Sequence, residues 1–152
     1  MKNIVLIFAL IFTTSICLAQ KTNPNYDADL AKKVNADDYG MKSYIFVILK
    51  TGSNTSQDKE LKNKAFAGHM DNINRLVKNK KMIVAGPMQK NDKSYRGIFI
   101  LDVSTIEEAE KLLLTDPAIK EKYLEPDLYV WYGSAALVTY LESADKVWKK
   151  GF

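Results

Sequence analysis

His69 is the only histidine in the 152-residue chain, and its side chain is the one best suited to move a proton near neutral pH. An imidazole gains and loses its charge in that range, which is what a general acid or base requires. Cys17 is likewise the only cysteine. These counts exclude a disulfide framework, a zinc site built only from Cys and His, and a nucleophile pair that needs a second thiol.

Arg96 and a group of aromatic residues are candidates for holding a ligand. A guanidinium can bind a carboxylate or a phenolate through two hydrogen bonds, although an arginine at a strand end is commonly only solvated. Planar ligands pack on aromatic side chains, although an aromatic strand is commonly part of a core. The aromatic candidates are Tyr129, Trp131 and Tyr132.

Short apolar runs rich in β-branched and aromatic residues predict four strands. They cover residues 44–49, 82–88, 95–103 and 128–132. The first and third runs are apolar on both faces, which is typical of strands in the middle of a sheet. Gly86 and Pro87 mark where the second strand bends or leaves its ladder, because proline has no N–H to donate. Pro126 is expected to precede the fourth strand.

An amphipathic helix is expected between the first two strands, at residues 59–80. Its buried face is marked by Phe66, Met70, Ile73 and Val77. His69 lies at the edge of this face, where a histidine is commonly a packed residue bonded to a backbone carbonyl. A structural and a functional role for His69 therefore both remain open.

A capping box at residues 104–107 predicts the start of a second helix, which ends before Pro117. Asp116 is well explained there as an N-cap with Pro117 in the first helical position, an arrangement worth about 1 kcal/mol. This local role is compatible with a functional one. Apolar residues from Leu137 to Trp148 predict a further, C-terminal amphipathic helix.

The order β-α-β-β-α-β indicates an α+β fold of the ferredoxin-like type, with the first and third strands in the middle of the sheet. Two helices can cover only one face of four strands. Because Ile45 and Phe46 point to opposite faces, the second face needs another layer. The sheet of a second copy is the simplest cover and predicts a homodimer, and the C-terminal helix is the alternative.

Several of these motifs together resemble the YCII-related family, over roughly residues 44–136. The resemblance rests on Gly68-His69-Met70 followed by Arg75-Leu76, on the segment from Met82 to Met88 with its Ala-Gly-Pro, and on Thr115-Asp116-Pro117. It implies a dimeric α+β barrel built on the ferredoxin-like fold. It also implies that His69 and Asp116 take the places of the family's paired His and Asp, proposed as an active site in a pocket beside the sheet.

Some branches of that family are associated with elimination of halide from hydroxylated aromatic rings, and most members have no known reaction. No Ser or Cys nucleophile is marked by a motif, so the pair favours acid–base chemistry of a lyase or isomerase, with Asp116 orienting His69. A non-catalytic module that binds a small ligand in the same pocket is the alternative. No metal, haem or other cofactor is expected. The expected ligand-binding residues are Arg96, Gly86, Pro87 and Tyr132.

Residues 1–19 have the pattern of a secretory signal peptide, with an early lysine, a short apolar run and Ala19 before the expected cut. An uncleaved membrane anchor is the alternative, but roughly 20 apolar residues are needed to span a bilayer and this run is interrupted by Thr13, Thr14 and Ser15. No stable membrane insertion is expected after cleavage. The mature chain would begin at Gln20 in the periplasm or outside the cell. Residues 20–40 are expected to be a polar tail with one short helix, followed by the YCII-like domain at 41–152.

Twenty-two basic and 18 acidic residues give a net charge of +4. These charges are interspersed and form no run of five or six of one sign, so binding to nucleic acid is not expected. The expected partners are a second copy of the chain and a small molecule that the sequence does not name.

Overall fold

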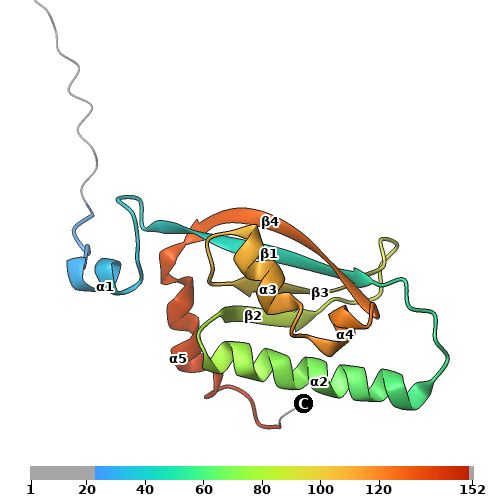
Figure 1. Ribbon diagram of the computed structural model, residues 1–152. Helices are drawn as coiled ribbons and strands as arrows, with labels where there is room; N and C mark the ends of the chain where they lie inside the picture. The colour runs from blue at the N-terminus through green and yellow to red at the C-terminus, as the bar shows by residue number, and fades with distance from the viewer. Residues whose placement is uncertain (1–22, 151–152) are drawn as a thin grey trace, which may run out of the picture.

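A four-stranded antiparallel sheet in the order β2-β3-β1-β4 lies at the centre of the computed structural model, which describes residues 23–150 (Figure 1). The strands are β1 (Met41–Thr51), β2 (Met82–Pro87), β3 (Tyr95–Leu101) and β4 (Leu124–Ser134). β1 and β3 occupy the middle, as their apolar character predicts. The expected signal peptide at residues 1–19 lies outside the described residues.

Helices connect these strands in the predicted order. The helical segments are α1 (Ala28–Lys33), α2 (Lys59–Lys78), α3 (Ile106–Leu113), α4 (Pro117–Lys120), the 3-10 helix η1 (Ala135–Tyr140) and α5 (Leu141–Ala144). α2 joins β1 to β2, and α3 with α4 joins β3 to β4. The βαββαβ order and the strand order confirm the ferredoxin-like α+β fold.

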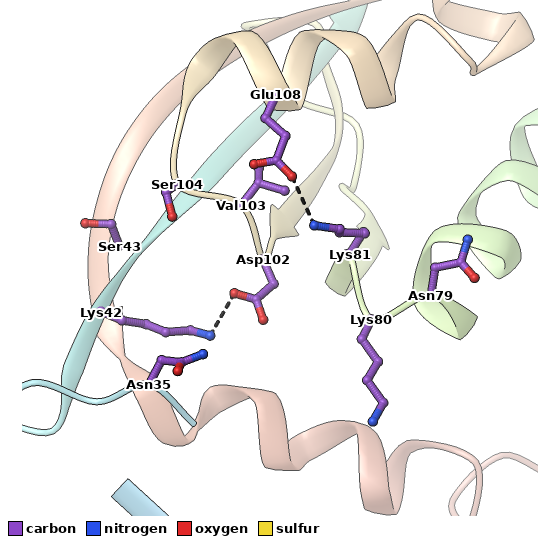
Figure 2. Close-up of a pocket in the computed structure, with 10 residues that line it drawn as sticks. All are labelled: Asn35, Lys42, Ser43, Asn79, Lys80, Lys81, Asp102, Val103, Ser104 and Glu108. Atoms are coloured by element: carbon purple, nitrogen blue, oxygen red, sulfur yellow. Dashed lines mark hydrogen bonds and ion pairs between the residues drawn. The ribbon is translucent and has the colours of Figure 1, made fainter. Parts of the chain in front are cut away.

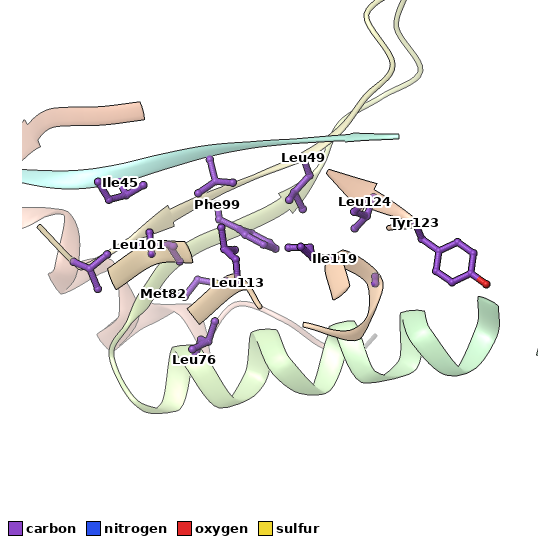
Figure 3. Packing of buried hydrophobic residues seen from close by; sticks show 14 of the residues in the cluster. Ile45, Leu49, Leu76, Met82, Phe99, Leu101, Leu113, Ile119, Tyr123 and Leu124 are labelled. Carbon is purple, nitrogen blue, oxygen red and sulfur yellow. The ribbon is translucent and has the colours of Figure 1, made fainter. Parts of the chain in front are cut away.

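The main hydrophobic core lies between one face of the sheet and the helices (Figure 3). Alternate residues of β1, including Ile45 and Val47, point into it and pair with Leu101 and Phe99 of β3. The helices contribute Leu76 of α2, Leu113 of α3 and Ile119 of α4. This period-two burial fixes which face of the sheet meets α2, the helix that carries His69.

The opposite face of the sheet is also apolar, but it is only partly covered. Its half-buried residues include Phe46, Ile48, Ile98 and Ile100. Tyr129 and Trp131 of β4 lie on the same face and are 51% and 38% exposed. Tyr44, at one end of this face, is fully buried because the segment that leads into η1 covers it, and its hydroxyl donates to the carbonyl of Ser134 (2.9 Å).

The prediction of a C-terminal amphipathic helix from Leu137 to Trp148 is wrong. The chain instead forms η1 and the short α5, and Val147 and Trp148 are 80% and 60% exposed. η1 begins at the buried Ala135, whose N–H donates to the carbonyl of Gly40 (2.9 Å), and it contacts β1 and β2. Residues held against the sheet in a 3-10 turn no longer follow the 3.6-residue period on which the prediction rested.

Several predicted boundaries also shift, and two of the shifts concern residues that the sequence marks. β4 begins at Leu124, so Pro126 lies inside the strand, where it pairs with Leu49, rather than before it. An edge strand tolerates proline because it needs ladder bonds on one side only. The N-cap of α3 is Thr105, whose hydroxyl accepts the N–H of Glu108, one residue later than the predicted box.

Residues 23–40 contain the one short helix that was predicted, α1, and they contact the domain at a few positions. The side chain of Asp27 caps α1. Lys33 lies 3.5 Å from Glu142 of α5, and Val34 is buried. Within residues 23–150, no helix is both long enough and apolar enough to cross a membrane.

Candidate active site

His69 is held between two aromatic rings in the middle of α2. Its ring stacks on Phe99 of β3 with centroids 5.9 Å apart and meets the edge of Phe66, one turn earlier in α2, at 6.0 Å. The residue is 9% exposed. The sheet and the helix together therefore fix the plane of the imidazole.

Asp116 lies between α3 and α4 and is fully buried. Its Oδ1 accepts the N–H of Ala118 (2.9 Å), which confirms the predicted N-cap of α4. Its Oδ2 lies 2.6 Å from Nδ1 of His69. The structure thus brings together the two residues that the resemblance pairs, and each carboxylate oxygen has its own partner.

Gly68 allows the two elements to approach so closely. A Cβ at this position would lie 2.7 Å from Cγ of Pro117, the first residue of α4. α4 therefore packs directly on the backbone of α2, one residue before His69. This contact is a physical reason for the Gly-His pair in the sequence.

The hydrogen bond determines which nitrogen of His69 is available for chemistry. An ionised carboxylate only accepts hydrogen bonds, so Nδ1 carries the proton of this contact, and the neutral ring keeps its lone pair on Nε2. Nε2 makes no hydrogen bond to any residue between 23 and 150. A base at Nε2, oriented from behind by a carboxylate, is the arrangement used for proton transfer.

A polar cluster beside the pair was not predicted. Arg75 donates from Nη2 to Oδ1 of Asn72 (2.6 Å) and to the hydroxyl of Thr115 (2.7 Å), the residue before Asp116. The cluster ties α2 to the segment that carries Asp116. Asn72 lies one helical turn after His69, and this spacing is the only signal in the sequence that indicates it.

A hollow of about 220 Å³, here called the Arg96 hollow, opens where β1 ends and β3 begins. It is lined by Thr51, Asn54, Lys62, Phe66, Arg96, Tyr123 and Leu124. Phe66 contacts both the ring of Tyr123 (6.1 Å) and that of His69. The hollow therefore lies one aromatic side chain away from His69.

The other expected ligand-binding residues do not line this hollow. Gly86 and Pro87 end the edge strand β2. A Cβ on Gly97 would lie 2.8 Å from the carbonyl oxygen of Gly86, so close backbone packing accounts for Gly97, whereas a Cβ on Gly86 itself would have no atom of the described residues within 4 Å. Tyr132 lies at the opposite end of the sheet, where its hydroxyl donates to Asp37. That hydrogen bond lowers the pKa of Asp37 and raises the pKa of Tyr132.

A larger hollow of about 580 Å³, the Lys42 hollow, lies at that opposite end (Figure 2). Its lining includes Lys42, Lys80, Lys81, Asp102 and Glu108. Two of the lysines are neutralised, since Lys42 lies 2.7 Å from Asp102 and Lys81 lies 3.0 Å from Glu108. This hollow is bigger, and like the Arg96 hollow it is lined by neither His69 nor Asp116.

The fold and the buried pair define a ferredoxin-like α+β domain with a histidine oriented by a carboxylate. Residues 44–126 match the YCII-related domain, and the chain belongs to that family. No curated protein matches the chain. Within residues 23–150, no group of three or more His, Cys, Asp or Glu side chains is placed to hold a metal ion.

Among solved structures, the chain is similar to 5-chloro-2-hydroxyhydroquinone dehydrochlorinase from Burkholderia phenoliruptrix AC1100, in complex with 2,5-dihydroxybenzoquinone. The two are 20% identical, and the match covers 57% of this chain and 90% of that chain with a TM-score of 0.37.

Proposed function

We propose that this protein is a small-molecule enzyme of the lyase or isomerase type, in which His69 moves a proton through Nε2 and Asp116 orients the ring. The observation that carries the proposal is the 2.6 Å contact between Nδ1 of His69 and the buried carboxylate of Asp116. In such a reaction, Nε2 takes a proton from a carbon or oxygen of the substrate, and the carboxylate stabilises the imidazolium that forms.

The environment of the pair favours this role over simple packing. A structural histidine at the edge of a helix typically bonds to a backbone carbonyl, whereas the partner here is a fully buried carboxylate. Burying a carboxylate is costly unless hydrogen bonds satisfy it. The bond to Ala118 satisfies Oδ1 alone, so the bond from His69 satisfies Oδ2 and at the same time fixes the orientation of the imidazole that general acid–base chemistry needs.

A non-catalytic module that binds a small ligand is the second candidate. The observation in its favour is the Arg96 hollow, which is separated from His69 by Phe66 and can hold a ligand whether or not His69 reacts. In this case His69 contributes only packing or a hydrogen bond. Turnover, rather than binding, separates the two candidates.

The test uses the full chain in D₂O with a panel of hydroxylated aromatic and carboxylate compounds, followed by NMR. An enzyme of this type exchanges an acidic C–H of its substrate for deuterium even when the complete reaction is unknown. We expect exchange or product formation with wild-type protein and none with His69→Gln, which keeps hydrogen-bonding capacity but cannot change its charge near pH 7. Equal rates in the two proteins would remove His69 from the chemistry.

A further inference from the structure

The Arg96 hollow has an uncompensated positive charge. Arg96 and Lys62 both line it, and its lining contains no carboxylate side chain. Neither residue forms an ion pair within residues 23–150, whereas Lys42, Lys50 and Lys81 each lie within 3.0 Å of a carboxylate oxygen. Two unpaired cations beside one hollow attract an anionic group.

The size and aromatic lining of the Arg96 hollow suit one planar ring. Phe66 and Tyr123 both line it, and their rings lie 6.1 Å apart with an angle of 45° between their planes. Its volume of about 220 Å³ is below the roughly 300–1,000 Å³ of sites for drug-sized ligands, and above the cavity of about 150 Å³ that accepts benzene. A single substituted aromatic ring fits these limits.

The wall of the hollow is held in place by backbone contacts. Gly52 donates to the carbonyl of Tyr123 (2.9 Å), and Asn54 donates to the carbonyl of Lys122 (2.9 Å). A Cβ on Gly52 would lie 2.1 Å from the carbonyl oxygen of Lys122, so the loop after β1 lies directly against the segment before β4. A preformed wall reduces the ordering cost of binding a small ligand.

We propose that the Arg96 hollow binds a small aromatic carboxylate, with the carboxylate on Arg96 and Lys62 and the ring against Phe66 and Tyr123. A carboxylate matches the two-pronged donor set of a guanidinium better than the single oxygen of a phenolate. The role of this ligand as substrate rests on the proposed function, because the hollow reaches His69 only through Phe66. Binding itself does not depend on that function.

The first experiment titrates the full chain with benzoate, benzamide and cyclohexanecarboxylate, followed by NMR. Benzamide keeps the ring without the charge, and cyclohexanecarboxylate keeps the charge without the planar ring. We expect benzoate to bind about tenfold more tightly than benzamide and several-fold more tightly than cyclohexanecarboxylate. The signals of His69 should shift on binding, and they are unambiguous because the chain has no other histidine. Equal binding of benzoate and benzamide would overturn the proposal.

The second experiment compares two variants that each remove one positive charge. Arg96→Gln should weaken benzoate binding about tenfold, because a charge-assisted contact is lost. Lys80→Gln makes the same change of charge in the Lys42 hollow and should leave binding unchanged. Arg96 and Lys80 are both exposed, so both variants should have the melting temperature of the wild type. An equal loss in both variants, or no loss in Arg96→Gln, would contradict binding at the Arg96 hollow.

The proposed binding site and the proposed enzymatic function can be contradicted independently of each other. His69→Gln should bind benzoate within about threefold of the wild type while losing deuterium exchange, since the charged contacts belong to Arg96 and Lys62. If the wild type does not bind benzoate but catalyses exchange through His69, the proposed ligand is wrong and the proposed enzymatic function is supported. If benzoate binds as described but no compound undergoes exchange, the proposed binding site is supported and the proposed enzymatic function is contradicted.

Discussion

Asp116 serves two partners with its two carboxylate oxygens. Oδ1 caps α4 through Ala118, and Oδ2 holds His69. A substitution that keeps one of these contacts and weakens the other can therefore separate structure from chemistry. Asparagine does this, because it is nearly as good an N-cap as aspartate but has no charge.

Asp116→Asn is expected to lower turnover at least a hundredfold while lowering the melting temperature by only a few degrees. The reason is that the cap on Ala118 survives, whereas the charge that orients and stabilises an imidazolium is lost. Rate and melting temperature are measured on the same preparation. Unchanged turnover with a large loss of stability would show that the pair is structural.

Tyr44 makes stability sensitive to alkaline pH. Burial raises the pKa of Tyr44 to about 12, and the charge of Asp102 adds to this effect. Because the folded-state pKa lies above that of the unfolded chain, this contribution is complete below about pH 10 and is lost as the pH rises through about 12. The complete loss amounts to about 3 kcal/mol.

Tyr44→Phe tests this linkage. At pH 8 the variant should be less stable by about 1 kcal/mol, because the hydrogen bond to the carbonyl of Ser134 is missing. Near pH 11 the difference should close, since only the wild type gains free energy in its unfolded state by ionising this phenol. Urea unfolding at the two pH values measures it. A constant difference would contradict the assigned cause.

The contact between the helices α2 and α4 sets the distance between His69 and Asp116. α4 is short and is anchored by its cap, and it rests on Gly68 through Pro117. Arg75 ties the neighbouring segment to α2 through Thr115. The geometry of the pair therefore depends on helix packing as well as on the two residues themselves.

Gly68→Ala should destabilise the fold by about 1–2 kcal/mol, although alanine is the better helix former. The added Cβ would lie 2.7 Å from Pro117, so α4 must move away and take Asp116 with it. Asn74→Ala, on the exposed side of the same helix, is the control and should cost little. Denaturant unfolding and turnover are measured together. Wild-type stability in Gly68→Ala would show that the contact is not tight.

At the scale of the whole molecule, we propose that a second copy covers the open face of the sheet. This face is apolar across β1, β3 and β4, and η1 closes only the end near Tyr44. The alternative, that the C-terminal segment covers this face within one subunit, is less well supported because Trp148 is largely exposed. Light scattering should therefore give about twice the mass of the monomer.

Two charge insertions on neighbouring residues of β4 test this interface. Tyr129 points to the open face and Val130 to the other side, and both are exposed. Tyr129→Glu should produce a monomer, because an unpaired charge would be buried between two sheets, while Val130→Glu should remain a dimer. A wild-type chain that is monomeric at micromolar concentration would contradict the proposed dimer.

We also propose export, on the basis of the pattern in residues 1–19. The native protein should begin at Gln20 and occur outside the cytoplasm. Intact-mass measurement of the protein from its own cells decides this. A mature chain in a membrane fraction that still carries residues 1–19 would contradict cleavage.

Local features of the sequence determined most of the fold. The apolar character of β1 and β3 placed them in the middle of the sheet, and Asp116 followed by Pro117 predicted the cap of α4. These predictions depend on periodicity and on contacts between residues close in sequence, so they need no knowledge of packing. The prediction of a C-terminal helix was wrong because η1 contacts β1 and β2, and these contacts outweigh the helical spacing of the apolar residues in that segment.

Which side chains meet depends on how the helices and strands pack. His69 and Asp116 are 47 residues apart, and only the packing of α4 on α2 sets them within hydrogen-bond distance; in the sequence their pairing rested on a family resemblance. Arg96 comes from β3 and Lys62 from α2, and nothing in their local sequence links them. Such distances depend on how whole elements pack, because local spacing constrains the chain over only one or two turns.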